Sequence, residues 1–127
     1  MPSQRRPPDR PVTFETVRKI ATALPGVQEG TSYGTPAFRV GAKFLARLWE
    51  DGETLVVRIG FDEREMLMQA DPGTFYITDH YRNYPAVLVR LAAVAPDRLR
   101  ELLEEAWRQQ VPKRLAARFD PSRRQPL

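Results

Sequence analysis

Four arginines of this sequence stand between apolar neighbours, in segments whose composition is typical of β-strands. Side chains alternate between the two faces of a strand, so the apolar neighbours point one way and the guanidinium points the other. If the strands share a sheet, one face is a hydrophobic floor and the other is an open, cationic surface. Guanidinium groups on such a surface bind phosphates or carboxylates. These arginines are Arg39, Arg47, Arg58 and Arg90.

Lys43 and Trp49 are expected on the same face of the sheet as these arginines. A cationic face that also carries an aromatic ring suits a ligand with phosphate groups and an apolar part, as nucleic acids have. The alternative is that the arginines are ordinary surface residues. Their aliphatic stems would then cover the sheet while their charged ends reach water.

A second group of polar and aromatic residues lies in the segment 79–85, which is expected to be a loop. Its tyrosines and arginine are suited to binding a base or a phosphate, and its histidine to acid–base work beside Asp79. Alternatively, the segment is a structural turn whose tyrosines cover the core. Neighbours in sequence seldom position each other as a catalytic pair, so no catalytic residue is assigned. The candidates here are His80, Tyr81, Arg82 and Tyr84.

The composition of the chain excludes several kinds of site. Its 127 residues include no cysteine and one histidine, which rules out disulfides, cysteine catalysis and multi-histidine metal clusters; no metal or cofactor is expected. The formal net charge of +4 favours an anionic partner, although much of it lies in the two ends of the chain. No apolar run is long enough to span a membrane, and no signal peptide is recognisable, so we expect a soluble, cytoplasmic protein without membrane contact.

The chain has the length of a single domain, which we place at residues 13–119. Residues 1–12 are rich in proline and arginine and are expected to form a disordered basic arm, and residues 120–127 a flexible tail. Helical spacing of apolar residues predicts three helices and a final turn. They span residues 13–24, 62–70, 96–109 and 113–119. Three strands separated by turns at 41–43 and 51–52 follow the first helix, and two more are expected at 75–78 and 86–93.

The two turns between the first three strands fix how these strands pair. Every resulting pair on one face is apolar, and a slip of one residue would destroy the match. The apolar pairs are Val40 with Phe44, Phe38 with Ala46, Leu48 with Leu55, Ala46 with Val57 and Phe44 with Ile59. The other face then holds Leu45 opposite Arg58, Arg47 opposite Val56 and Trp49 opposite Thr54. The element order α-β-β-β-α-β-β-α predicts an α+β fold, a two-layer α/β sandwich with an antiparallel sheet and helices on one face.

Several short segments together resemble the MmcQ/YjbR family, and the similarity covers nearly all of residues 13–119. They are Leu24–Gly30, Tyr33–Val40, Lys43–Arg47, Thr78–Tyr81, Tyr84–Leu91, Leu102–Trp107 and Pro112–Leu115. The resemblance implies a two-layer α/β fold similar to frataxin (CyaY-like) and to secretion chaperones. It also implies a DNA-binding protein, in a group for which no enzymatic activity or cofactor is established.

The sequence therefore predicts a monomeric, non-enzymatic protein that binds an anionic partner, above all nucleic acid, through the arginine-bearing face of its sheet. The candidate binding residues are Arg39, Lys43, Arg47, Trp49, Arg58, His80, Tyr81, Arg82, Tyr84, Arg90, Lys113 and Arg114. One alternative is a chaperone-like interaction module whose arginines meet an acidic protein. Another is a small-molecule or catalytic site around His80, for which a pocket joining His80, Tyr33 and Arg39, together with a strongly shifted pKa of the histidine, would be the sign.

Overall fold

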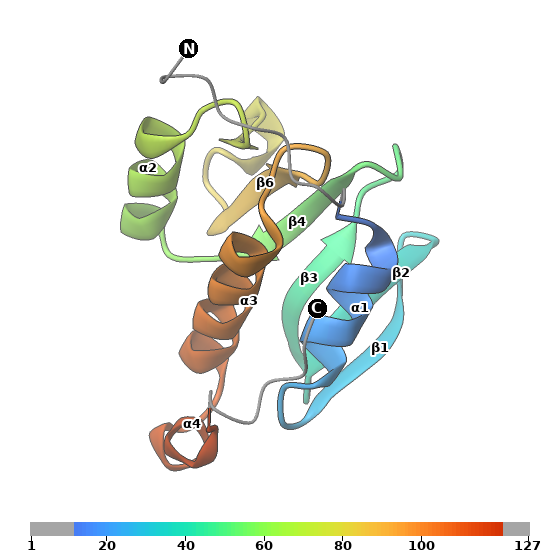
Figure 1. Cartoon of the computed structure of the whole chain (residues 1–127), viewed down its shortest axis with the longest axis vertical. Helices are drawn as coiled ribbons and strands as arrows, with labels where there is room; N and C mark the ends of the chain where they lie inside the picture. Colours follow the sequence, from blue (N-terminus) through green and yellow to red (C-terminus); the bar gives the residue numbers. More distant parts are fainter. Residues whose placement is uncertain (1–11, 121–127) are drawn as a thin grey trace.

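The computed structural model describes residues 12–120 of the chain, which form one six-stranded sheet and four helices (Figure 1). The helices are α1 (Phe14–Thr22), α2 (Phe61–Ala70), α3 (Pro96–Gln110) and α4 (Lys113–Arg118), with a short 3₁₀ helix η1 (Asp79–Tyr81). The strands are β1 (Val27–Ser32), β2 (Thr35–Val40), β3 (Lys43–Leu48), β4 (Thr54–Arg58), β5 (Phe75–Tyr76) and β6 (Ala86–Arg90). Their order in the sheet is β1-β2-β3-β4-β6-β5, and every neighbouring pair is antiparallel.

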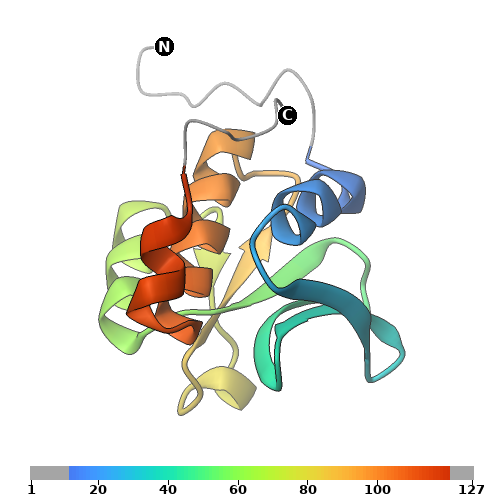
Figure 2. The same ribbon diagram turned by 90° about the horizontal axis from the view of Figure 1, so that it is seen from below.

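The main hydrophobic core lies between the helices and one face of the sheet. α1 and α3 lie side by side on that face, which we call the helix face (Figures 1 and 2). The core includes the fully buried Phe38, Leu55 and Leu103 and the buried ring of Trp107, whose indole Nε1–H donates to the Pro25 carbonyl at 2.8 Å. The predicted α+β fold, with helices on one face of an antiparallel sheet, is confirmed.

One strand was not expected. The glycine-, serine- and threonine-rich composition of residues 29–36 predicts an approach to the first strand, but residues 27–32 form β1, which pairs with β2 along its whole length. The segment contains Gly30 and only one buried apolar residue, Val27, so it lacks the alternation of apolar residues by which a strand is recognised. An edge strand needs less buried apolar surface than a central one, because it has a neighbour on one side only.

The predicted register holds for part of the sheet and is wrong near Phe44. The pairs Phe38 with Ala46, Ala46 with Val57, Leu48 with Leu55 and Arg47 with Val56 are confirmed. Val40, however, pairs with Lys43 and not with Phe44, because a β-bulge leaves Leu45 without a partner on β2. An extra residue in one strand reverses the alternation of side chains beyond it. Leu45, expected beside Arg58, is therefore in the main core, and Phe44, expected in the core, lies on the opposite face.

The face away from the helices, called the outer face below, is not the open surface that we expected. The segment that contains η1 lies against it (Figure 2). A second, smaller hydrophobic cluster forms there, from the buried Val56, Tyr81, Ala86 and Leu88 with the partly buried Phe44, Trp49, Tyr76 and Ile77 around them. The outer face is therefore half covered, and what remains of it is hollowed.

The expected arm at residues 1–12 and tail at 120–127 lie outside the described residues, apart from Val12 and Asp120. Val12 is buried in the main core, so the folded part begins at least one residue before the predicted boundary.

Candidate functional site

The outer face holds a pocket of about 700 Å³, a size typical of small-ligand sites. It lies between the β1–β2 hairpin, the outer side of β3 and β4, and the segment around η1. Five of its lining residues are aromatic, two are arginines, and the remainder include one carboxylate and one histidine. The lining residues are Ser32, Tyr33, Arg39, Phe44, Arg47, Trp49, Glu50, Val56, His80, Tyr81 and Tyr84.

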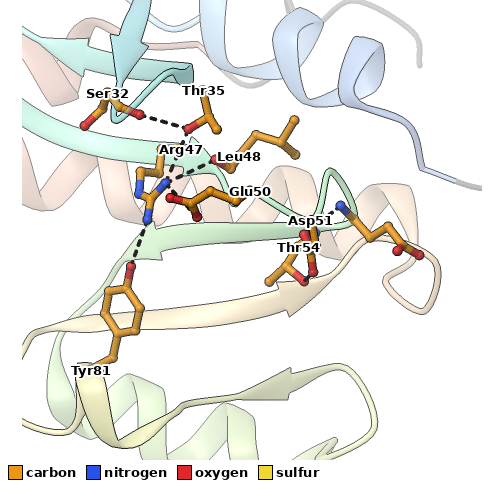
Figure 3. Close-up of polar contacts among 9 residues, drawn as sticks. Ser32, Thr35, Arg47, Leu48, Glu50, Asp51, Thr54 and Tyr81 are labelled. Atoms are coloured by element: carbon orange, nitrogen blue, oxygen red, sulfur yellow. Dashed lines mark hydrogen bonds and ion pairs between the residues drawn. The ribbon is translucent and has the colours of Figure 1, made fainter.

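Arg47 lines this pocket, and its contacts link the β1–β2 hairpin, β3 and the segment of Tyr81 (Figure 3). Its guanidinium is buried and donates hydrogen bonds to the Thr35 hydroxyl (3.3 Å), the Leu48 carbonyl (3.4 Å) and the Tyr81 hydroxyl (3.4 Å). Glu50 balances its charge at 3.5 Å. All of these contacts are longer than the usual 2.9 Å or so of a strong bond, and longer still than a charge-assisted one. The guanidinium is therefore held in place but keeps capacity for a stronger anionic acceptor.

Tyr33 stands at the mouth of the pocket, at the tip of the β1–β2 hairpin. It is the only residue other than glycine with a positive φ (+53°) among residues 12–120, and Gly34 follows it at φ +79°. Two positive φ values in a two-residue hairpin loop indicate a type I′ turn, whose first position favours asparagine, aspartate or glycine. For a residue with a Cβ atom, the left-handed backbone conformation is less favourable by about 1 kcal/mol or more. Tyr33 as a residue is 85% exposed, and the Arg47 guanidinium carbon lies 5.4 Å from the centre of its ring.

The opposite wall is an aromatic group around Tyr81. The Trp49 ring meets it edge-on at a centroid distance of 6.3 Å, the His80 ring at 5.0 Å, and the Tyr84 ring lies tilted at 6.1 Å. Tyr81 is buried, whereas His80 and Tyr84 are exposed. The rings thus present edges and faces toward one hollow, which is an arrangement suited to a flat ring.

Arg64 of α2 holds this wall in place from beneath. Its buried guanidinium donates to the carbonyls of Tyr81 (3.0 Å), Tyr84 (2.8 Å) and Ala86 (3.2 Å) and, through the second terminal nitrogen, of Arg82 (3.0 Å). Arg64 was not among the predicted site residues. Arg64 precedes Leu67 by three residues and Met68 by four, and this spacing indicates that it lies on the core side of the helix.

The structure brings six of the twelve candidate residues together in the pocket. They are Arg39, Arg47, Trp49, His80, Tyr81 and Tyr84. Arg58 and Arg90 are also on the outer face but outside the pocket, at opposite ends of the β4–β6 pair. Arg90 packs on the Tyr76 ring, with 3.9 Å between its guanidinium carbon and the ring centre.

The remaining four candidates lie away from the pocket. Lys43 is exposed at the β2–β3 turn, and Arg82 is exposed in an ion pair with Asp79 at 2.6 Å. Lys113 and Arg114 begin α4, whose Leu115 and Ala116 pack on the main core, so they belong to the helix face. The arginines therefore do not form one continuous cationic surface.

Sequence reasoning placed Val56 and Tyr33 near this site but did not assign Ser32, Phe44 or Glu50 to it. Phe44 was missed because the bulge at Leu45 reverses its direction. Ser32 and Glu50 carry no signal in the sequence, since only the tertiary fold brings them to the pocket.

The described residues carry no net formal charge, because 15 lysines and arginines balance 15 aspartates and glutamates between residues 12 and 120. The charge of +4 comes from the ends of the chain, which contain five arginines and one aspartate. Within residues 12–120 no group of three or more histidine and acidic side chains is placed to hold a metal ion. None of the described helices has the length and apolarity to cross a membrane.

Two carboxyl groups outside the pocket have lowered pKa values. Hydrogen bonds from the Arg18 guanidinium at 2.7 and 3.0 Å lower the pKa of Glu29. Desolvation of the Asp51 carboxyl opposes its ionisation, but hydrogen bonds from the amides of Glu53 and Thr54 and from the Thr54 hydroxyl outweigh this and lower its pKa (Figure 3). These hydrogen bonds stabilise the fold around the site: those of Glu29 join β1 to α1, and those of Asp51 close the β3–β4 turn.

Comparison with known proteins places the fold in a family. The YjbR family model matches residues 22–109, which is more than half of the chain. The chain belongs to the YjbR family. Uncharacterized proteins of Mycobacterium tuberculosis and Mycobacterium bovis are 34% identical, over 84% of this chain and 95% of theirs.

A solved YjbR structure has the same fold. The crystal structure of a Deinococcus radiodurans protein with the domain DUF419, which is the YjbR family, superposes with a TM-score of 0.69. It is 24% identical in sequence and covers 90% of this chain and 86% of its own. At that identity the similarity supports the fold alone. The family membership that the sequence segments implied is confirmed.

Proposed function

We propose that this YjbR protein is a non-enzymatic nucleic-acid-binding protein that takes an unpaired base of a single strand into the outer-face pocket. The observation that carries the proposal is the pocket itself, where five aromatic rings and two arginines line one hollow of about 700 Å³. Aromatic platforms with adjacent cations are how single-stranded nucleic acids are bound without regard to sequence.

The distribution of charge favours a single strand over a duplex. A duplex is bound mainly through its regularly spaced phosphates, which calls for a broad cationic surface. The described residues are neutral overall, and the outer-face arginines are separated by the aromatic cluster. A single strand asks less of the surface, because stacking of its bases supplies about 1–3 kcal/mol each.

Each arginine of the outer face has a part in this proposal. Arg39 lines the pocket, and no hydrogen bond or ion pair engages its side chain within residues 12–120, so it is free to meet a phosphate next to the bound base. Arg58 has the same freedom beyond the pocket and suits a neighbouring phosphate. Arg47 is buried among structural partners, and its replacement would disturb the pocket walls as well as binding.

The test is a binding titration of the full chain with a labelled oligothymidylate of ten nucleotides, in which the affinity is measured at rising salt. The double variant R39A/R58A removes two phosphate contacts, so its affinity falls several-fold and the salt slope becomes shallower by about 1.4, at about 0.7 per contact. The matched control is K113A/R114A, which removes the same charge from the helix face and should change the slope far less. Absence of binding at low salt, or equal effects of the two double variants, would contradict the proposal.

A second candidate function is a site for a free small molecule. It is favoured by one observation, namely that a single pocket joins His80, Tyr33 and Arg39, as such a site would require. The same titration separates the two functions. A strand gains affinity over a free nucleotide because its further phosphates can meet Arg58 and are attracted by the net positive charge of the chain. If a nucleotide binds as tightly as the ten-residue strand, the pocket serves a small molecule.

A further inference from the structure

We propose that Tyr33 is the stacking lid of the outer-face pocket, and that the unit bound beneath it is a single nucleoside monophosphate, its base on Tyr33 and its phosphate on Arg47 and Arg39. This inference rests on the function proposed above. It goes further by naming the unit that is recognised and the residue that closes over it.

The first observation is the conflict between the residue and its backbone. Tyr33 occupies the first position of a turn with φ +53°, where asparagine or glycine fits without strain. The residue is 85% exposed, so little packing offsets that strain in the ligand-free protein. A strained residue that the rest of the structure holds in place is a sign of function when it also borders a site.

The second observation is where the strained turn puts the ring. The closing pair of the hairpin, Ser32 and Thr35, is fixed by a hydrogen bond of 2.9 Å from the Thr35 hydroxyl to the Ser32 carbonyl. The same Thr35 hydroxyl accepts a hydrogen bond from the Arg47 guanidinium (Figure 3). The turn is thus tied to the Arg47 side chain, and the Tyr33 ring stands 5.4 Å from the Arg47 guanidinium carbon, at the pocket mouth.

The third observation is the unused capacity of Arg47. Its hydrogen bonds of 3.3–3.4 Å are weak for a guanidinium, and its ion pair with Glu50 reaches only 3.5 Å. A phosphate offers shorter, charge-assisted bonds. When the phosphate binds Arg47, the ring of Tyr33 is released from the cation and is free to stack on the attached base. Tyr33 and Arg47 can therefore bind one ligand that carries both a flat ring and an anionic group.

The experiment compares the full-length protein with Tyr33→Asn and Tyr33→Phe, using thymidine 5′-monophosphate and the ten-residue oligothymidylate as probes. Two tryptophans report separately by NMR, since the Trp49 indole lines the pocket whereas the Trp107 indole is buried in the core. Ligand should shift the Trp49 signal and leave the Trp107 signal in place. Tyr33→Asn should weaken both probes about tenfold, and Tyr33→Phe should bind within twofold of the unsubstituted protein.

The same variants are also compared without ligand. Because asparagine tolerates the left-handed backbone, Tyr33→Asn should raise the midpoint of thermal unfolding by about 2 °C, while Tyr33→Phe leaves it unchanged. A midpoint that stays the same or falls in Tyr33→Asn would mean that the ring serves the ligand-free fold, and would overturn the inference. Unchanged affinity of Tyr33→Asn overturns it too, with the proposed function intact. If the unsubstituted protein binds neither probe, both proposals fail.

Discussion

At the scale of single residues, the structure divides the arginines by what surrounds them. The side chains of Arg39 and Arg58 make no hydrogen bond or ion pair within residues 12–120, and the Arg90 side chain lies on the Tyr76 ring. Arg47 and Arg64 are buried, and their donors hold backbone and side-chain oxygens from different elements. Arg64 is taken up by backbone carbonyls and is not available to a partner. Arg47 is held only by contacts of 3.3–3.5 Å, so an anion that enters the pocket can still bind it.

The first prediction concerns Arg64, which binds four carbonyls with two nitrogens. Lysine keeps the charge but not the planar fork, so Arg64→Lys leaves some of these carbonyls without a donor. We expect the free energy of unfolding to fall by about 2–3 kcal/mol, measured by urea denaturation. Arg108→Lys, in an exposed contact with Glu105 at 3.9 Å, is the control and should change it by less than about 0.5 kcal/mol. Equal effects of the two substitutions would contradict the assigned role.

At the scale of elements, two hairpins and one bulge shape the site. The β1–β2 hairpin carries Tyr33, the bulge at Leu45 turns Phe44 to the outer face, and the β3–β4 hairpin presents Trp49 and Glu50. The β3–β4 turn is closed by Asp51, whose carboxylate accepts the amides of Glu53 and Thr54 at 2.9 and 3.0 Å and the Thr54 hydroxyl at 2.8 Å. A carboxylate that satisfies three donors fixes the end of the strand pair.

This turn gives a prediction about pH. The three hydrogen bonds lower the pKa of Asp51 in the folded protein, so their stabilising effect is fully present above the ordinary aspartate pKa. It is lost as the pH falls below about 4 and through the lower folded-state value. Asp51→Asn keeps an acceptor oxygen but cannot titrate. The midpoint of thermal unfolding should therefore drop less between pH 5 and pH 3 in Asp51→Asn than in the unsubstituted protein.

Glu29 has the same sign of dependence, because Arg18 also lowers its pKa. It contributes equally to both proteins in this comparison and so cancels. A pH profile that is identical with and without the Asp51 carboxyl would show that the turn has no part in the acid sensitivity.

At the scale of the whole molecule, charge and shape are separated. Residues 12–120 hold the pocket and have no net formal charge, whereas the excess of positive charge lies in the sequences before and after them. In the proposed function, the charge of the chain ends supplies long-range attraction to the nucleic acid, and the pocket selects the bound unit. The two contributions are separable by substitution in the full-length chain.

A variant in which Arg5, Arg6, Arg10, Arg123 and Arg124 are replaced by glutamine makes that separation. We expect its affinity for the oligothymidylate to fall and the dependence of that affinity on salt to become shallower, because fewer counterions are released. Its affinity for thymidine 5′-monophosphate should stay within twofold. A matching loss for the mononucleotide would place these arginines at the pocket and contradict the division.

The sequence by itself determined the class of fold, the helices and the register of β3 against β4. These features depend on the local spacing of apolar and polar residues and on the Asp51–Gly52 turn, which is recognisable from its sequence alone. It also identified six residues of the pocket, because polar and aromatic residues between apolar ones have a definite direction on a strand or stand out in a loop.

Only the tertiary structure decided which candidates meet and how the face is shaped. One extra residue at Leu45 reversed Phe44, and the segment around Tyr81 covered a face that alternation alone leaves open. Contacts such as Arg64 with the carbonyls of 81–86 join residues about 20 apart, and the bond from Arg47 to Tyr81 spans 34. Periodicity reports which side of its own strand a residue occupies. What lies above that side depends on chain that is distant in sequence, and therefore on how the whole molecule folds.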